Sequence, residues 1–132
     1  MKIFLDTNVL VGAVFSPTGV CFKVIEKVYE EHTIVISVEV LNELGDVLKR
    51  KTTLTDQEIA KVIYRHGKLG LVTQKQKKHA VAVRDPDDQI ILERVLGEGA
   101  EILITGDKDL LDIRAEVKAL KIVSPKAFLH TF

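Results

Sequence analysis

The sequence predicts an α/β fold with three layers, α/β/α, around a central parallel sheet of four to five strands. Short apolar runs alternate along the chain with longer amphipathic stretches, which is typical of parallel strands joined by helices. The 132 residues are 46% hydrophobic and 29% charged, an ordinary globular balance that can bury a core. We therefore expect one domain that spans residues 1–132.

The first part of the chain predicts two strands with a helix between them. Residues 2–5 are an apolar strand that ends at Asp6, and a loop around Pro17 follows it. Apolar residues at helical spacing predict the first helix from about residue 20 to residue 31. Residues 33–36 are then the second strand.

Two helices are expected next, each with a recognisable first residue. Ser37 can cap a helix that carries one apolar stripe. Thr55 and Glu58 form a capping box for the second helix. That helix ends at Gly67 or at Gly70, because glycine favours the end of a helix.

The middle of the chain is less regular. Residues 71–73 are a short strand, and the lysine-rich segment 74–79 is expected to be an exposed connection. The apolar residues 80–83 fit either a strand or a loop. A capped helix follows, because Asp85 suits the capping position and Pro86 suits the first helical position.

The last part of the chain adds two strands. Residues 102–105 are a strand that ends at Gly106 and Asp107. Residues 121–123 are the last strand, and a short helical turn follows Pro125. These two strands complete the predicted sheet of four to five strands.

Composition excludes several classes of protein. The single cysteine, Cys21, cannot form an internal disulfide, and no apolar stretch approaches the ~20 residues of a membrane span. Asp6 interrupts the first apolar run, so no secretory signal is visible and we expect a cytoplasmic protein. The chain has 19 basic and 19 acidic residues, which argues against nucleic-acid binding by bulk charge alone. The basic clusters at 49–51 and 75–78 fit a solvated face and a phosphate contact equally well.

Four acidic residues are expected to meet at one edge of the sheet. Ligands of open parallel sheets bind at the carboxyl ends of the strands, and Asp6 and Asp107 follow two such ends. Glu43 and Asp88 lie near the starts of helices that follow loops on the same side. Each acid also has a simpler interpretation as a turn, capping or exposed helix residue, and for Asp85 the capping role is favoured.

A cluster of carboxylates indicates a particular chemistry. Such groups repel one another unless a cation neutralises them, and oxygen-only clusters suit Mg²⁺ or Mn²⁺. A pair of these ions, roughly 3.5–4 Å apart, is the usual clamp for attack of water on a phosphodiester. The histidines at 32, 66, 79 and 130 lack the spacing of zinc ligands, and no glycine-rich phosphate loop is present.

Four segments, in order along the chain, resemble the motifs of PIN domains. They are Lys2–Leu10 with Asp6, Ser37–Leu44 with Glu43, Arg84–Asp88 followed by Ile90–Leu92, and Ile104–Leu111 with Asp107. Residues Ile122–Phe128 resemble the closing strand and turn of the family, so the match spans nearly the whole chain. The subgroup that it resembles most is that of the prokaryotic toxins of toxin–antitoxin pairs, of the VapC type.

The resemblance implies a PIN-like fold and a nuclease that uses Mg²⁺ or Mn²⁺ to cleave single-stranded RNA. It also implies a homodimer and inhibition by a small antitoxin. Position by position, it implies that the catalytic, metal-binding acids are Asp6, Glu43, Asp88 and Asp107. The polar residues that would orient these acids are Asn8, Ser37 and Thr105.

Two assignments and two rival functions stay open. Asp85 can join or replace Asp88, and Asp109 is a further candidate ligand beside Asp107. An acid-pocket phosphatase or phosphoacceptor domain would usually carry a second acid where this chain has Asn8. A catalytically silent interaction module with the same fold is the other rival, although all four acids are present in this chain.

Overall fold

The computed structural model describes residues 1–78 and 81–132, and the strands in these ranges form one five-stranded parallel sheet. The strands are β1 (Lys2–Leu5), β2 (Thr33–Ser37), β3 (Leu71–Thr73), β4 (Ile102–Ile104) and β5 (Lys121–Val123). The helices in the same ranges are α1 (Thr7–Phe15), α2 (Val20–Glu31), α3 (Val38–Lys51), α4 (Asp56–Gly67), α5 (Pro86–Glu98), α6 (Lys108–Asp112) and α7 (Pro125–Thr131).

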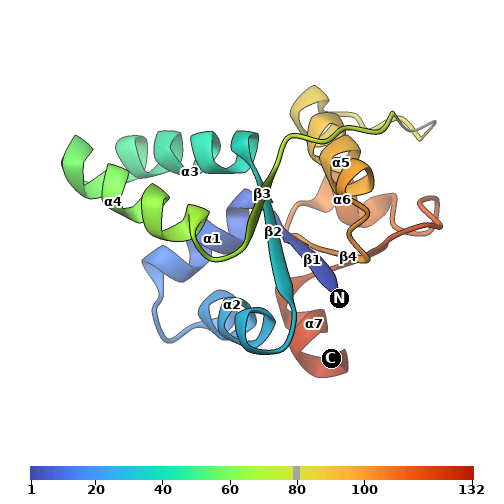
Figure 1. Cartoon of the computed structure of the whole chain (residues 1–132), viewed down its shortest axis with the longest axis horizontal. Helices are drawn as coiled ribbons and strands as arrows, with labels where there is room; N and C mark the ends of the chain where they lie inside the picture. Colours follow the sequence, from blue (N-terminus) through green and yellow to red (C-terminus); the bar gives the residue numbers. More distant parts are fainter. Residues whose placement is uncertain (79–80) are drawn as a thin grey trace.

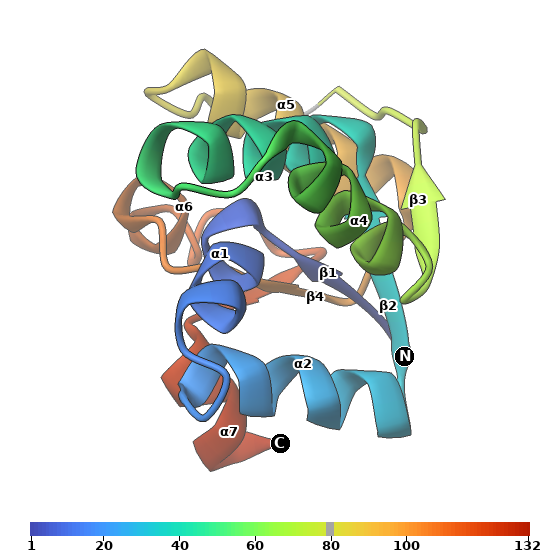
Figure 2. The ribbon, with the colours of Figure 1, turned by 90° about the vertical axis from the view of Figure 1, so that its left-hand side faces the viewer.

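The sheet lies between two layers of helices. Figure 1 shows α1, α2, α3 and α4 on one side of the strands, and α5 and α6 on the other. Figure 2, turned by 90°, shows the first of these layers from its outer side, with α7 packed near α2. The predicted three-layer fold with a parallel sheet of four to five strands is therefore confirmed.

The strand order places a crevice between β1 and β4. The order is β3-β2-β1-β4-β5, so the chain proceeds outward from β1 to β3 and then crosses to the other side of β1. Helices that precede this crossing cover one face of the sheet, whereas α5 and α6 cover the other. The carboxyl ends of β1 and β4 are thus the switch point at which sheets of this type bind ligands.

The central strands are buried on both faces. Ile3, Phe4 and Leu5 of β1 are fully buried, and Leu103 and Ile104 of β4 are fully buried as well. Strands covered on both faces read as continuous apolar runs, which is why the sequence identifies them so directly.

Two helices differ from the sequence-based expectation. The loop expected after β1 is confined to the residues around Pro17, and α1 occupies Thr7–Phe15 before it. Helix α1 buries Val9 and Ala13 on one face but carries Val11 and Phe15 on the opposite face, so its apolar residues form no single stripe. Helix α6 has only five residues, too few to reveal a helical period.

The irregular middle of the chain is largely as expected. Residues 74–78 are exposed and form no regular element, and residues 81–83 are a loop rather than a strand. His79 and Ala80, which belong to these two predictions, lie outside the described residues. Within the described ranges no single helix is long and apolar enough to cross a membrane; α1 and α2 pass that test only as a pair, with a bend of 115° between them.

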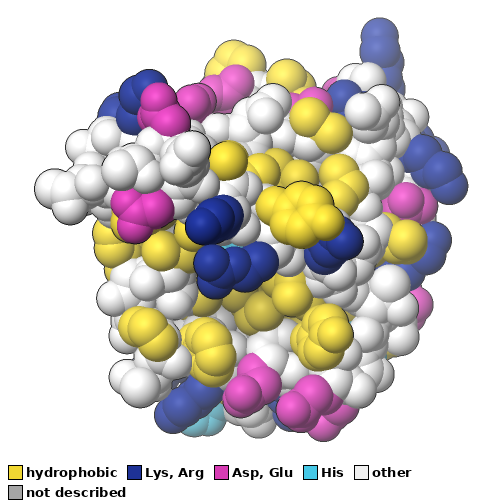
Figure 3. Space-filling view, turned by 60° about the vertical axis from the view of Figure 1, so that its left-hand side comes forward, with side chains coloured by type: hydrophobic (Ala, Val, Ile, Leu, Met, Phe, Trp, Pro, Cys, Tyr) yellow, Lys and Arg dark blue, Asp and Glu magenta, His cyan; other side chains and the backbone are white. Residues whose placement is uncertain are grey.

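The outer layer of α1, α2 and α4 exposes an apolar groove. The groove encloses about 320 Å³, and Phe22 on its wall is 41% exposed. Arg65 and His66 of α4 line the same groove. Figure 3 shows this side of the molecule, where apolar side chains gather around several lysine and arginine side chains.

Candidate metal centre

A cavity of about 390 Å³ lies at the carboxyl ends of β1 and β4. The sequence-predicted acids that line it are Asp6, Glu43, Asp88 and Asp107, and Asn8 lines it beside them. These residues come from four separate segments of the chain, namely the ends of β1 and β4 and the helices α3 and α5. The structure therefore brings together all four acids that the sequence singled out.

Asp6 is held rigidly at the start of α1. Its Oδ1 atom accepts the backbone N–H of Thr7 at 2.7 Å, which caps the helix, and its Oδ2 atom accepts the Thr105 hydroxyl at 2.8 Å. The residue is only 4% exposed. Burial raises the pKa of Asp6 from 3.8 to about 6; the two hydrogen bonds oppose this shift, and the negative charges of Glu43 and Asp107 add to it.

The Thr105 hydroxyl joins the ends of the two central strands. It donates to Asp6 and accepts the backbone N–H of Asp107 at 3.0 Å. Asn8 supports the same junction, because its Oδ1 atom accepts the backbone N–H of Gly106 at 2.7 Å. Both side chains also contact Asp6 Oδ2, to which the Thr105 hydroxyl donates at 2.8 Å and Asn8 Nδ2 donates at 3.4 Å.

Helix α3 carries Glu43 into the cavity. The hydroxyl of Thr7 donates to Glu43 Oε2 at 3.1 Å. This hydrogen bond connects Glu43 to helix α1, which Asp6 caps. Ser37 is fully buried and caps α3 by accepting the backbone N–H of Val40 at 3.3 Å. Ser37 does not line the cavity, so its contribution is the position of α3 rather than a contact with an acid.

Asp88 has a buried carboxylate oxygen atom, Oδ2, that lacks a hydrogen bond within the described residues. The residue lies in the first turn of α5 and is 9% exposed. Burial raises the pKa of Asp88 to about 8, and the negative charge of Asp107 adds to that shift. An orphaned carboxylate oxygen that faces other carboxylates is what a site for a hard cation would contain, so the residues fit Mg²⁺ or Mn²⁺.

Of the two additional candidate ligands, Asp109 lies within a group of three acids and Asp85 does not. Asp88, Asp107 and Asp109 each offer an oxygen atom, and these atoms lie within 4.8 Å of one another. Asp109 also receives an ion pair at 2.9 Å from Arg84. Asp85 instead accepts the backbone N–H of Asp87 at 2.8 Å as the cap of α5, and it lies outside both the cavity lining and this group of three.

The sequence predicts no role for Thr7 or Arg84, and for Lys51 it leaves a solvated face and a phosphate contact equally open. Thr7 holds Glu43, Arg84 pairs with Asp109, and Lys51 lines the cavity from the last turn of α3. The helical spacing of Lys51, eight residues after Glu43, places both on one face of α3 and could have indicated this position. Thr7 and Arg84 carry no comparable pattern, because their partners are distant in sequence.

The fold and the cavity together define a class of protein: a doubly wound parallel α/β domain with a carboxylate-lined cavity at its switch point. A family model described as PIN domain matches residues 2–109 of the chain. An uncharacterized protein of Methanocaldococcus jannaschii is 31% identical to this chain over an alignment of 144 positions. The alignment covers 100% of this chain and 92% of that protein. The chain belongs to the PIN-domain family.

Two solved structures have the same fold. One is VapBC2 from Rickettsia felis bound to a DNA fragment from its promoter, with a TM-score of 0.68, 16% identity, and coverage of 94% of this chain and 98% of that one. The other is VapBC-1 from nontypeable Haemophilus influenzae, with a TM-score of 0.68, 14% identity, and coverage of 96% and 99%. The architecture of this chain is thus that of VapBC proteins.

Proposed function

We propose that this chain is a divalent-metal-dependent endoribonuclease, a hydrolase that cleaves single-stranded RNA in the cytoplasm. One observation carries the proposal: four carboxylates from four separate segments line one cavity, and one of them has a buried oxygen atom that no group in residues 1–78 or 81–132 hydrogen-bonds. Membership of the PIN-domain family supports a nuclease. The acids Asp6, Glu43, Asp88 and Asp107, with Asp109, are the proposed ligands of Mg²⁺ or Mn²⁺.

The proposed chemistry divides between the cation and the chain. When bound, Mg²⁺ or Mn²⁺ would polarise the phosphate and lower the pKa of a bound water molecule. The chain supplies fixed carboxylates: Thr105 orients Asp6, and Thr7 orients Glu43. Burial raises the pKa of Asp88 to about 8, so this carboxyl group would have to release a proton in order to hold a cation.

The first experiment is cleavage of an end-labelled single-stranded RNA by the purified chain. Cleavage with Mn²⁺ or Mg²⁺ that stops in EDTA supports the proposal, and internal rather than terminal products support an endonuclease. A single-stranded DNA of the same sequence distinguishes a ribonuclease from a general nuclease. Cleavage that continues in EDTA would contradict the proposal.

Lys51 is expected to contact the RNA backbone. It is exposed, lines the cavity, and forms no ion pair with the described residues, whereas the nearby Lys49 pairs with Asp56 at 3.5 Å. Lys51→Met should weaken RNA binding and reduce the dependence of log affinity on log salt by about 0.7, the value for one phosphate contact on a single strand. Lys49→Met should change neither quantity.

This prediction is measured by fluorescence anisotropy in Ca²⁺, with salt varied from about 50 to about 200 mM. An unchanged slope for Lys51→Met would assign Lys51 to the solvated surface.

The groove between α1, α2 and α4 is the proposed docking site of a small antitoxin. Its wall is apolar, and Arg65 gives it a positive rim that suits an amphipathic segment with acidic flanks. Two solved structures with this fold are of VapBC proteins, which supports a partner of this kind. Phe22→Asp should therefore abolish stoichiometric co-purification of a small antitoxin with this chain, while RNA cleavage is retained.

Light scattering provides the check on this docking site. A dimer of the chain that Phe22→Asp converts to a monomer would assign the groove to a second copy instead. A dimer that persists in the variant would place the expected homodimer interface elsewhere.

A further inference from the structure

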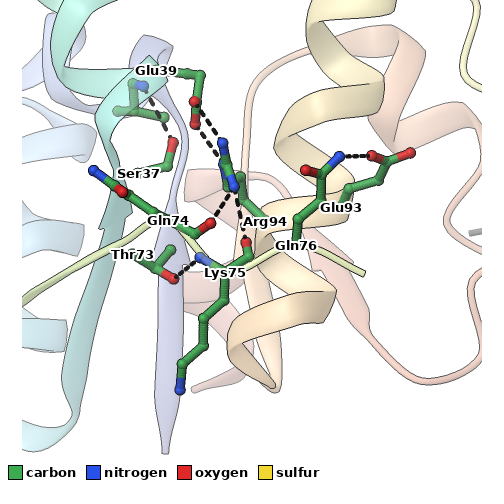
Figure 4. Close-up of polar contacts among 9 residues, drawn as sticks. Ser37, Glu39, Thr73, Gln74, Lys75, Gln76, Glu93 and Arg94 are labelled. Carbon is green, nitrogen blue, oxygen red and sulfur yellow. Dashed lines mark hydrogen bonds and ion pairs between the residues drawn. The ribbon is translucent and has the colours of Figure 1, made fainter. Parts of the chain in front are cut away.

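A polar clasp centred on Arg94 joins the two helical layers of the protein (Figure 4). Arg94 of α5 forms two parallel hydrogen bonds with Glu39 of α3, from Nε to Oε1 at 2.9 Å and from its terminal nitrogen to Oε2 at 3.0 Å. The same guanidinium donates to the backbone carbonyl groups of Gln74 and Lys75, in the segment that follows β3. One side chain therefore connects three separate parts of the chain.

The geometry of the clasp requires arginine. Only a planar guanidinium can form a two-point contact with a carboxylate and still donate to carbonyl groups beside it. Arg94 lowers the pKa of Glu39, chiefly through the hydrogen bonds between them, and Glu39 raises the pKa of Arg94 in the same way. Both side chains are partly shielded from solvent, so this contact is stronger than that of an ordinary surface pair.

The segment after β3 is fastened along α5 by further contacts. The backbone N–H of Lys77 donates to the Glu93 carbonyl at 3.0 Å, and the Gln76 side chain donates to the Glu93 carboxylate at 2.5 Å. Gly97 permits this close approach, because a Cβ atom there would lie 2.6 Å from the backbone nitrogen of Gln76. The segment that Arg94 contacts, after β3, is thus also held against α5 by these other contacts.

The two helices that the clasp joins also carry two acids of the candidate metal centre. Glu39 precedes Glu43 by one turn of α3, and Arg94 follows Asp88 on α5. Figure 1 shows these helices on opposite sides of the sheet, so Glu43 and Asp88 reach the cavity from different layers. The described structure shows no direct hydrogen bond between Glu43 and Asp88 that could fix their separation.

We propose that Arg94 is a positioning residue, whose contact with Glu39 sets the distance between Glu43 and Asp88 and thereby the cation selectivity of the site. This inference rests on the proposed function. Mg²⁺ requires near-ideal octahedral geometry with short bonds, whereas Ca²⁺ accepts longer bonds and a variable number of ligands. A site that loosens should therefore lose Mg²⁺ more than it loses Ca²⁺.

The test measures cation binding apart from catalysis. Mn²⁺ binding to the purified full chain is followed by electron paramagnetic resonance, with Mg²⁺ and Ca²⁺ as competitors. Arg94→Met should weaken Mg²⁺ binding by up to about tenfold, since tenfold is the low end for residues that hydrogen-bond to a metal ligand directly and Arg94 acts through Glu39. Ca²⁺ binding should weaken less. Glu39→Gln, which keeps the shape of the side chain, should shift the selectivity in the same direction by a smaller factor.

Lys2→Met is the matched control. Lys2 pairs with Glu98 at 3.4 Å, at the opposite end of α5 from Asp88, so this variant also removes an ion pair from the helix. It should leave the ratio of Mg²⁺ to Ca²⁺ affinity unchanged even where it lowers the melting temperature.

Each outcome has a distinct meaning. A normal selectivity ratio in Arg94→Met would overturn the positioning role and leave the clasp as a purely structural contact. If Arg94→Met does not fold, a normal ratio in Glu39→Gln overturns it equally. Absence of Mn²⁺ binding by the wild-type chain would instead contradict the metal centre itself, and with it the proposed function.

Discussion

Replacing Asp6 with asparagine is expected to abolish RNA cleavage and to leave the fold intact. The buried carboxylate of Asp6 lies at the switch point, where it would bind the cation directly. Loss of a metal-mediated stabilisation worth several kcal/mol corresponds to about a thousandfold in rate. Asparagine keeps the oxygen atom that caps α1 and removes a buried charge, so the melting temperature should not fall by more than a few degrees.

Asp85→Asn is the matched control for this variant. Asp85 also caps a helix through its side chain, but it does not line the cavity. Asparagine caps helices as well as aspartate does, so Asp85→Asn should cleave RNA at the wild-type rate. Normal cleavage by Asp6→Asn, or equal losses in both variants, would contradict the assignment of the site. The measurement is single-turnover cleavage of labelled RNA in saturating Mn²⁺.

The second large effect concerns stability without metal. The pKa values of Asp6 and Asp88, about 6 and about 8, lie above the ordinary value of 3.8, so the folded chain retains protons that the unfolded chain loses. The free energy of unfolding that these groups contribute is therefore fully present below about pH 4 and falls as the pH rises through 6 and 8. For Asp6 alone the shift corresponds to on the order of 3 kcal/mol, or roughly 10 °C in melting temperature.

Added cation should reverse this trend. Metal ligands must be ionised, so the stabilisation by Mg²⁺ should grow with pH over the range in which the metal-free chain weakens. The measurement is thermal unfolding in EDTA and in Mg²⁺ at several pH values between about 6 and about 8. Asp88→Asn should flatten the pH dependence in EDTA and reduce the effect of Mg²⁺. A metal-free melting temperature that rises over this range would show that the carboxylates do not repel one another as the structure implies.

The sequence predicted those features whose determinants are local. Continuous apolar runs identified the buried central strands, and the capping box of Thr55 and Glu58 is present as predicted. Asp85 and Pro86 likewise begin α5 as expected. Helix α1 escaped because apolar residues surround it on most sides, which removes the periodic pattern from which a helix is predicted.

The candidate site was predictable in its residues but not in its contacts. The topology rule placed Asp6 and Asp107 at one edge of the sheet and Glu43 and Asp88 in helices that begin on the same side; the resemblance to PIN domains then assigned a metal-binding role to all four. Contacts such as those between Thr7 and Glu43, or between Arg94 and Glu39, join residues that lie 36 and 55 positions apart. These contacts depend on how whole helices pack against one another, so no local sequence pattern predicts them.

The strand order also determines when, during synthesis of the chain, the candidate site can form. Strand β1 can pair with β2 as soon as both have left the ribosome, but the other edge of β1 pairs with β4, which is synthesised after β1, β2 and β3. The Thr105 hydroxyl that orients Asp6 arrives with that late segment, and Asp107 follows it. A nascent chain that stops before β4 therefore has no complete site. Completion of the candidate site thus depends on a segment that is synthesised after the first three strands.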